Sequence, residues 1–198
     1  MPTLVLMRHG EAGFAARDRA RPLTPRGREE AASQARAIAR VVGGIDVAVV
    51  SEAARTQQTL AALRSAGLAV ARVWEEASLY SRGGEGLLET LRDLDRCGIE
   101  GAVREADDAE AGFEADAVLV VGHEPTMSTL AGLLATREKG LHESRGRARF
   151  RALRGPGAAR ADNSFKYGFS TAMAVVGHVE SWSSLAPGCM RIADVLRP

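Results

Sequence analysis

The sequence predicts an α/β domain in which a mostly parallel central sheet is covered by helices on both faces, a three-layer α/β/α sandwich. Three short, continuously apolar runs lead to this prediction: residues 3–7 (TLVLM), 46–50 (DVAVV) and 117–121 (AVLVV). Apolar runs without polar alternation are typical of strands buried on both faces, which parallel sheets favour. Helical patterns separate the three runs, as crossovers between parallel strands require.

The segment between the first two predicted strands has the signals of one complete helix. Thr24 is a suitable N-cap, Pro25 fits the first helical position, and Gly43 with Gly44 marks the end. Apolar residues recur at spacings of three and four, which gives this helix one narrow stripe to pack on the sheet. The residues of this stripe are Ala31, Ala35, Ile38, Ala39 and Val42.

The alternation of strands and helices continues along the chain. Ser51 is the predicted N-cap of a helix that ends at Gly67, and another helix begins at Pro125 or Thr126 after the third strong strand. The remaining predicted elements are a weaker strand at 70–74, a short helix at 85–94, a fourth strand at 171–176, and a last strand or final helix at 191–195. We therefore expect a single domain over residues 1–198.

Composition limits the class of protein. The chain has 198 residues, 45% hydrophobic side chains and a formal net charge of +1, which describes one globular domain. Cys97 and Cys189 form no Cys-x-x-Cys pattern, so neither a disulfide framework nor a zinc site is predicted. The chain shows no signal segment and no run near the ~20 apolar residues of a spanning helix. We expect a cytoplasmic protein that does not contact a membrane.

Two charged stretches interrupt this pattern. Residues 89–116 carry ten acidic residues against three arginines, which is typical of a solvated helix or loop. Residues 145–166 carry seven basic residues against Asp162, and we expect a mobile basic insertion at about 137–165. Clustered arginines can neutralise nucleic-acid phosphates, but the stretch 145–160 has one aromatic residue, Phe150, for stacking. A nucleic-acid partner is therefore not favoured.

Two histidines directly follow strong strand predictions, and two arginines accompany them. Arg8 and His9 follow the first strand, His123 follows the third, and Arg55 lies in the first turn after the second. Ligand sites of open α/β sheets form beyond the carboxyl ends of the strands, so we expect these four side chains to share one crevice. Guanidinium groups offer paired N–H donors that match the oxygens of a phosphoryl group.

The motifs around these residues resemble those of the histidine phosphatase superfamily, the phosphoglycerate mutase-like group. The matching segments are MRHGE (7–11), RTQQT (55–59) and VGH (121–123). A narrower similarity, to the SixA-type phosphohistidine phosphatases, comes from RPLT (21–24), LY (79–80) with LL (87–88), GHEP (122–125) and FST (169–171). The resemblance implies a phosphoglycerate mutase-like fold. It also implies catalytic roles for His9, Arg8, Arg55 and His123, with Arg21 as a further ligand of the phosphate.

The resemblance also implies a mechanism. Neutral His9 attacks phosphorus to form a phosphohistidine enzyme, and water later releases phosphate. The ordinary imidazole pKa is ~6.5, so we expect the arginines to favour the neutral ring and a nearby hydrogen-bond acceptor to fix its tautomer. This scheme requires no cofactor or metal, and the sequence has no His-x-His or paired-carboxylate cluster for a metal ion.

The general acid remains open at this stage. The larger mutase-like families place a glutamate after the second crossover, where this chain has Glu75 and Glu76, and the resemblance does not single out one of the two. The candidates are Glu11, Glu76 and Glu124. Because an imidazole leaves more easily than an alkoxide, a weak or absent acid agrees with a phosphohistidine substrate.

Three functions therefore compete. The leading hypothesis is a SixA-like phosphatase that hydrolyses phosphohistidine in a protein. The alternatives are a small-molecule phosphomonoesterase of the same superfamily and a non-catalytic module that binds phosphorylated ligands. The expected partner is accordingly a phosphorylated protein or a small phosphorylated metabolite, and specificity would come from the loop around Tyr80 and the basic insertion.

Overall fold

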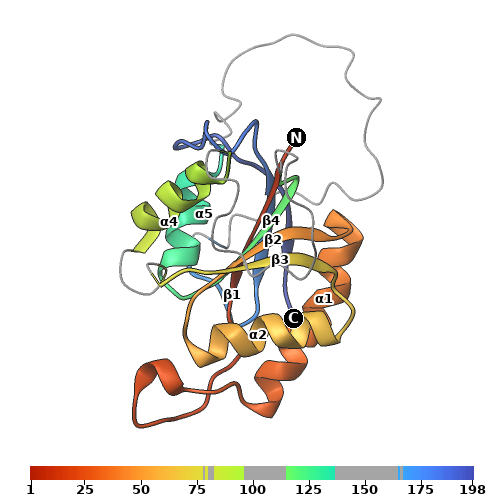
Figure 1. The fold of residues 1–198 in the computed structure, drawn as a ribbon, viewed down its shortest axis with the longest axis vertical. Coiled ribbons are helices and arrows are strands. Elements are labelled where there is room, and N and C mark those ends of the chain that lie inside the picture. Colours follow the sequence, from red (N-terminus) through yellow and green to blue (C-terminus); the bar gives the residue numbers. More distant parts are fainter. Residues whose placement is uncertain (78, 80–82, 96–114, 137–164, 166) are drawn as a thin grey trace, which may run out of the picture.

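The computed structural model describes residues 1–77, 79, 83–95, 115–136, 165 and 167–198 (Figure 1). Tyr80, Cys97, most of the acidic stretch and the expected basic insertion at 137–165 lie outside the described residues, except for Phe165. Phe165 is fully buried in the core.

A six-stranded sheet with the order β3-β2-β4-β1-β5-β6 forms the centre of the molecule. Parallel pairing joins β1 to β4, β2 to β4 and β2 to β3, whereas β5 pairs antiparallel with β1 and β6. The prediction of a mostly parallel sheet is therefore confirmed. The strands are β1 (Thr3–Arg8), β2 (Ile45–Val50), β3 (Val70–Glu75), β4 (Ala117–Gly122), β5 (Ala174–His178) and β6 (Arg191–Leu196).

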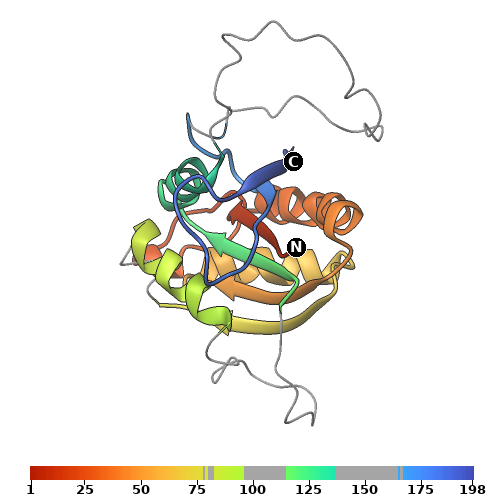
Figure 2. The same cartoon turned by 90° about the horizontal axis from the view of Figure 1, so that it is seen from above.

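Helices cover both faces of this sheet, as the two views show (Figures 1 and 2). Side chains of α1 (Pro25–Val42) and α2 (Ala54–Ser65) pack with one set of strand residues, and those of α4 (Gly83–Arg92) and α5 (Thr126–Leu134) pack with the other. In β4, for example, Leu119 faces α1 and α2, whereas Val120 faces α4 and α5. Both faces are covered, which explains why the strand sequences are apolar without alternation.

The predicted capping of the first helix is confirmed. The Thr24 hydroxyl accepts a hydrogen bond from the Gly27 amide at 3.0 Å, and Pro25 occupies the first position of α1. Gly43 ends the helix with φ of +85°, a backbone conformation that glycine adopts at little cost.

The prediction that Ser51 caps the second helix is wrong. The helix α2 begins at Ala54, and Ala53 is its N-cap. The Ser51 carbonyl instead accepts hydrogen bonds from Thr56 Oγ1 at 2.8 Å and Gln57 Nε2 at 3.0 Å, so Ser51 lies outside the helix. The Ser51 side chain is fully buried, and its hydroxyl contacts His123, as described below.

The first of the two C-terminal strands begins later than the sequence predicts. The expected strand at 171–176 starts at Ala174, because Thr171 and Ala172 form a turn in which the Ala172 amide donates to the His9 carbonyl at 3.0 Å. Of the two possibilities for 191–195, the structure has the strand, β6. Two short 3₁₀ turns complete the described elements: η1 (Asp18–Ala20), between β1 and α1, and η2 (Asp93–Asp95), after α4. No helix among the described residues has the length and apolar character to cross a bilayer.

Candidate active site

The loop that follows β1 holds His9 rigidly against the rest of the fold. The His9 amide donates to the Gly122 carbonyl at 3.1 Å, and the Gly10 amide donates to Thr59 Oγ1 at 3.1 Å. Gly10 and Gly27 bring this loop against the first turn of α1, since a Cβ on Gly10 would overlap the Gly27 carbonyl and one on Gly27 would overlap Glu11 main chain. The contact therefore requires glycine at both positions.

The two histidines meet at the carboxyl edge of the sheet. His123 follows β4, which lies next to β1, and the ring centroids of His9 and His123 are 5.3 Å apart with an interplanar angle of 62°. His123 Nε2 lies 2.9 Å from the buried Ser51 hydroxyl. Adjacent parallel strands thus place both imidazoles side by side at the carboxyl edge of the sheet, as the rule for ligand sites of α/β sheets predicts.

Hydrogen bonds assign the tautomer of His9. Nδ1 lies 2.7 Å from the Gly10 carbonyl oxygen, which can only accept, so Nδ1 carries the proton. Nε2 in turn accepts from the Nε–H group of Arg55 at 3.2 Å. The nitrogen that keeps a lone pair is therefore Nε2.

Burial keeps both imidazoles neutral. The pKa of His9 is lowered to about 4, chiefly by burial; the Gly10 hydrogen bond opposes this shift, and the charges of Arg55, Arg8 and Arg21 add to it. The pKa of His123 is lowered to about 3, again chiefly by burial and then by Arg55. The sequence reasoning expected the arginines to have this effect, whereas desolvation is the larger cause.

Arg55 connects His9, in the loop after β1, to the turn η1. Its side chain is only 6% exposed and lies in the first turn of α2. While Nε donates to His9, Nη1 donates to the Asp18 carbonyl at 2.7 Å and Nη2 donates to Asp18 Oδ2 at 3.0 Å. One guanidinium group thus spans the His9 ring and an acidic residue.

The charges of two more arginines, Arg8 and Arg21, act on the His9 ring and lower its pKa. Arg8 Nη1 donates to the Phe169 carbonyl at 2.6 Å, whereas its Nε is buried without a hydrogen-bond partner. Arg21 Nε donates to the Gly13 carbonyl at 2.8 Å, and Nη1 donates to Asp18 Oδ1 at 3.2 Å. The structure therefore brings together Arg8, His9, Arg21, Arg55 and His123.

The three candidate general acids lie at different places around this crevice. Glu11 Oε1 accepts from the Thr24 hydroxyl at 2.8 Å, so this carboxylate is directed toward the start of α1. Glu124 Oε2 accepts from Ser128 Oγ at 2.5 Å, and its Oε1 is buried without a hydrogen-bond partner. Glu76 directly follows β3, and its amide donates to the Val50 carbonyl at 2.8 Å.

The sequence reasoning missed Asp18, the carboxylate that contacts both Arg55 and Arg21. One signal was present: Asp18 and Arg21 are three residues apart, a spacing at which side chains of one helical turn meet. Ser51 was also missed, because it was interpreted only as a helix cap. Among the described residues, no group of three or more His, Cys, Asp or Glu side chains could hold a metal ion.

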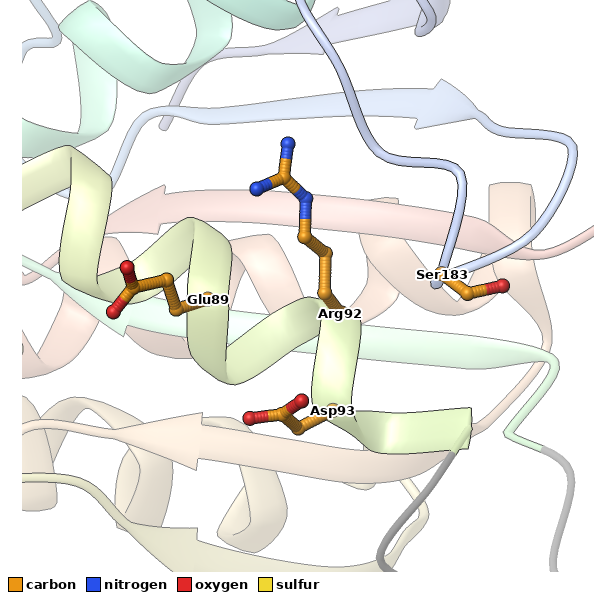
Figure 3. Close-up of a pocket in the computed structure, with 4 residues that line it drawn as sticks. All are labelled: Glu89, Arg92, Asp93 and Ser183. Atoms are coloured by element: carbon orange, nitrogen blue, oxygen red, sulfur yellow. The ribbon is translucent and has the colours of Figure 1, made fainter.

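A cavity of about 260 Å³ lies elsewhere in the molecule, lined by Glu89, Arg92, Asp93 and Ser183 (Figure 3). Arg92 donates from Nε and Nη2 to the Leu185 carbonyl at 2.8 and 2.6 Å, so its guanidinium ties α4 to the segment after β5. That segment leaves the sheet at His178, which pairs with Thr3 at the edge opposite His9. The cavity is therefore separate from the histidine site.

One protein-family model matches the N-terminal part of this chain. Residues 4–79 match the family model for the histidine phosphatase superfamily (branch 1). No curated protein sequence matches the chain.

Solved structures with the same fold cover nearly the whole chain. The candidate phosphohistidine phosphatase SixA of Nakamurella multipartitia is 28% identical, with a TM-score of 0.68 over 100% of this chain and 96% of that one. The protein histidine phosphatase SixA in complex with tungstate is 20% identical, with a TM-score of 0.66 over 98% and 96% of the two chains. A phosphoglycerate mutase of Plasmodium falciparum is 12% identical, with a TM-score of 0.50 over 98% and 89%. These likenesses confirm the phosphoglycerate mutase-like fold.

Proposed function

We propose, on the premise of the confirmed resemblance to the histidine phosphatase superfamily, that this chain is a phosphatase that forms a phosphohistidine intermediate on His9. The observation that carries this proposal is the state of the His9 ring. The ring is neutral, and the Gly10 carbonyl fixes its proton on Nδ1. Its Nε2 atom lies beside Arg55, and the centroid of the ring lies 5.3 Å from that of the His123 ring. A neutral ring with its proton fixed on Nδ1 is what a nitrogen nucleophile for phosphorus requires.

The reaction has two steps. His9 Nε2 attacks phosphorus, which forms an N–P bond and breaks the bond to the leaving group. Water then attacks the same phosphorus, which frees His9 and yields inorganic phosphate. The Gly10 carbonyl, at 2.7 Å from Nδ1, stabilises the positive charge that the ring acquires. Arg8, Arg21, Arg55 and His123 are the proposed donors to the phosphoryl oxygens, where negative charge is spread in the transition state.

A phosphorylated histidine in a protein is the proposed substrate. The 28% identical relative is described as a candidate phosphohistidine phosphatase, which supports this class. The acid requirement agrees with it: the carboxylates of Glu11 and Glu124 are hydrogen-bonded to Thr24 and Ser128, and a leaving imidazole needs less protonation than an alkoxide.

A comparison of substrates tests the function. Hydrolysis of a phosphohistidine peptide and of a panel of sugar phosphates is measured with the wild type and with His9→Ala. We expect kcat/KM for the peptide to exceed that for each sugar phosphate by at least ~10-fold, because the leaving imidazole needs less help. Turnover of the panel alone would reject the phosphohistidine substrate in favour of a metabolite phosphomonoesterase. Binding of these compounds without turnover of any of them would support the non-catalytic module that binds phosphorylated ligands.

The ionisation of His9 gives a pH prediction. Its pKa of about 4 means that the ring stays the free base well below pH 6.5, so kcat/KM should show no loss from His9 protonation until about pH 4. The unfolded chain binds this proton near pH 6.5, so the free energy of unfolding should also decrease as the pH falls from about 6.5 to 4. NMR titration of the His9 ring measures the pKa directly. A midpoint near 6.5 would contradict the structure.

A further inference from the structure

Asp18 uses the same arginine donors that the proposed reaction assigns to phosphate. Its Oδ2 accepts from Arg55 Nη2 at 3.0 Å, its Oδ1 accepts from Arg21 Nη1 at 3.2 Å, and its main-chain carbonyl accepts from Arg55 Nη1 at 2.7 Å. A carboxylate that bridges two guanidinium groups resembles two oxygens of a bound phosphoryl group in charge and spacing.

The Asp18 charge also acts on His123. It raises the pKa of His123 and so partly opposes the lowering by burial and by Arg55. Arg55 meanwhile donates from Nε to His9 Nε2, so the same guanidinium that binds Asp18 also covers the lone pair of the nucleophile. The donors of Arg55 are thus engaged with His9 and with Asp18.

The turn that carries Asp18 lies at the surface. The η1 turn has three residues with no buried side chain, and the Asp18 side chain is 49% exposed. Arg55, in contrast, is 6% exposed and fixed in α2. An incoming anion would therefore displace the exposed carboxylate rather than the buried guanidinium.

We propose that the Asp18 carboxylate is a displaceable substitute for the phosphoryl group, which occupies Arg55 and Arg21 in the resting site and gives way when substrate binds. This inference rests on the proposed function, because it assumes that a phosphoryl group binds these arginines. Asp18 is then a positioning residue: it holds Arg55 oriented between turnovers, and it competes with every anion that enters. The apparent affinity for an anion is lowered by the fraction of molecules in which Asp18 occupies the arginines.

The test is the affinity of the folded protein for inorganic phosphate, measured by calorimetry without any turnover. Asp18→Asn keeps the size of the side chain and one neutral acceptor for the arginines, but it removes the competing charge. We expect this variant to bind phosphate about 10-fold more tightly than the wild type, as for a site that Asp18 closes in about 90% of molecules. A purely structural role for Asp18 would give weaker binding instead.

Glu52→Gln is the matched control. Glu52 also pairs with an arginine of η1, Arg19, so this variant removes one negative charge from the same rim without touching Arg55. We expect its phosphate affinity to stay within about 2-fold of the wild type, because exposed charges are screened by salt. Equal increases in phosphate affinity for Glu52→Gln and Asp18→Asn would show that only the net charge of the site matters, and would overturn the inference.

Crystal structures of the wild type with and without phosphate give a second measurement that needs no variant. Displacement of Asp18 from Arg55 by bound phosphate is the expected result, and an Asp18 that keeps both arginines beside the bound anion would overturn the inference. Equal or weaker phosphate binding by Asp18→Asn, with clear binding by the wild type, would overturn it and leave the proposed function standing. No phosphate binding by any variant would contradict the proposed anion site itself.

Discussion

Replacement of His9 by alanine is expected to abolish phosphatase turnover, with kcat lowered by ~10³-fold or more, because the nucleophile is lost outright. His123 cannot replace it, since its Nε2 lies 2.9 Å from the Ser51 hydroxyl and its ring approaches His9 at 62°. Turnover of a phosphohistidine peptide and trapping of labelled phosphoenzyme at alkaline pH, where phosphohistidine survives, measure the two steps.

His178→Ala is the control for this experiment. His178 is bonded to Thr3 Oγ1 through Nδ1 at 3.2 Å, and it lies at the end of β5, on the opposite edge of the sheet from His9. Its loss should change kcat by less than about 2-fold, as is usual for substitutions away from a site. Labelled phosphoenzyme that persists in His9→Ala would place the nucleophile on another residue.

Arg55→Lys should lower kcat/KM by ~10²–10³-fold, although the positive charge is kept. An ammonium group offers no planar fork, so it cannot serve His9 Nε2 and two further acceptors from one rigid plane, as Arg55 does through Nε, Nη1 and Nη2. The size of the loss measures how much of the catalysis depends on the geometry of the guanidinium group rather than on its charge.

Arg64→Lys, at the exposed end of the same helix, is the matched control and should keep full activity. Arg55 is buried and Arg64 is not, so Arg55→Lys could also destabilise the fold. Thermal unfolding of both variants measures this effect separately from the change in kcat/KM. A loss of less than 3-fold in a folded Arg55→Lys enzyme would remove Arg55 from the set of groups that stabilise the transition state.

The fold was predictable because its strongest signals are local. Each central strand is a mostly apolar run, since both of its faces are covered, and α1 has a Thr24 cap and a Gly43 stop that act within a few residues. The wrong predictions fall on residues whose positions depend on contacts between segments far apart in the sequence. Ser51 has the composition of a cap, but it is held outside α2 and bonded to His123, whose place beside it depends on the pairing of β2 with β4.

The site was predictable to the extent that it lies at strand ends. His9 and His123 follow adjacent parallel strands, so the topology alone brings them together. Asp18 escaped the prediction because a loop between β1 and α1 returns it to Arg55, 37 residues along the chain, and no periodic pattern records such a return. The candidate acids Glu11 and Glu124 carry no local signal for the direction of their carboxylates, which Thr24 and Ser128 determine in the folded chain.

The contact of Gly10 with Gly27 limits which substitutions this fold accepts. Two main chains touch there with no side chain between them, so the loop after β1 and the start of α1 cannot be separated by even one methyl group without moving the backbone. A side chain at either position alone would overlap the main chain of the other segment. Both segments would have to shift together to accept one. New specificities in this scaffold are therefore expected to arise from the loops around the site, while His9 keeps its place.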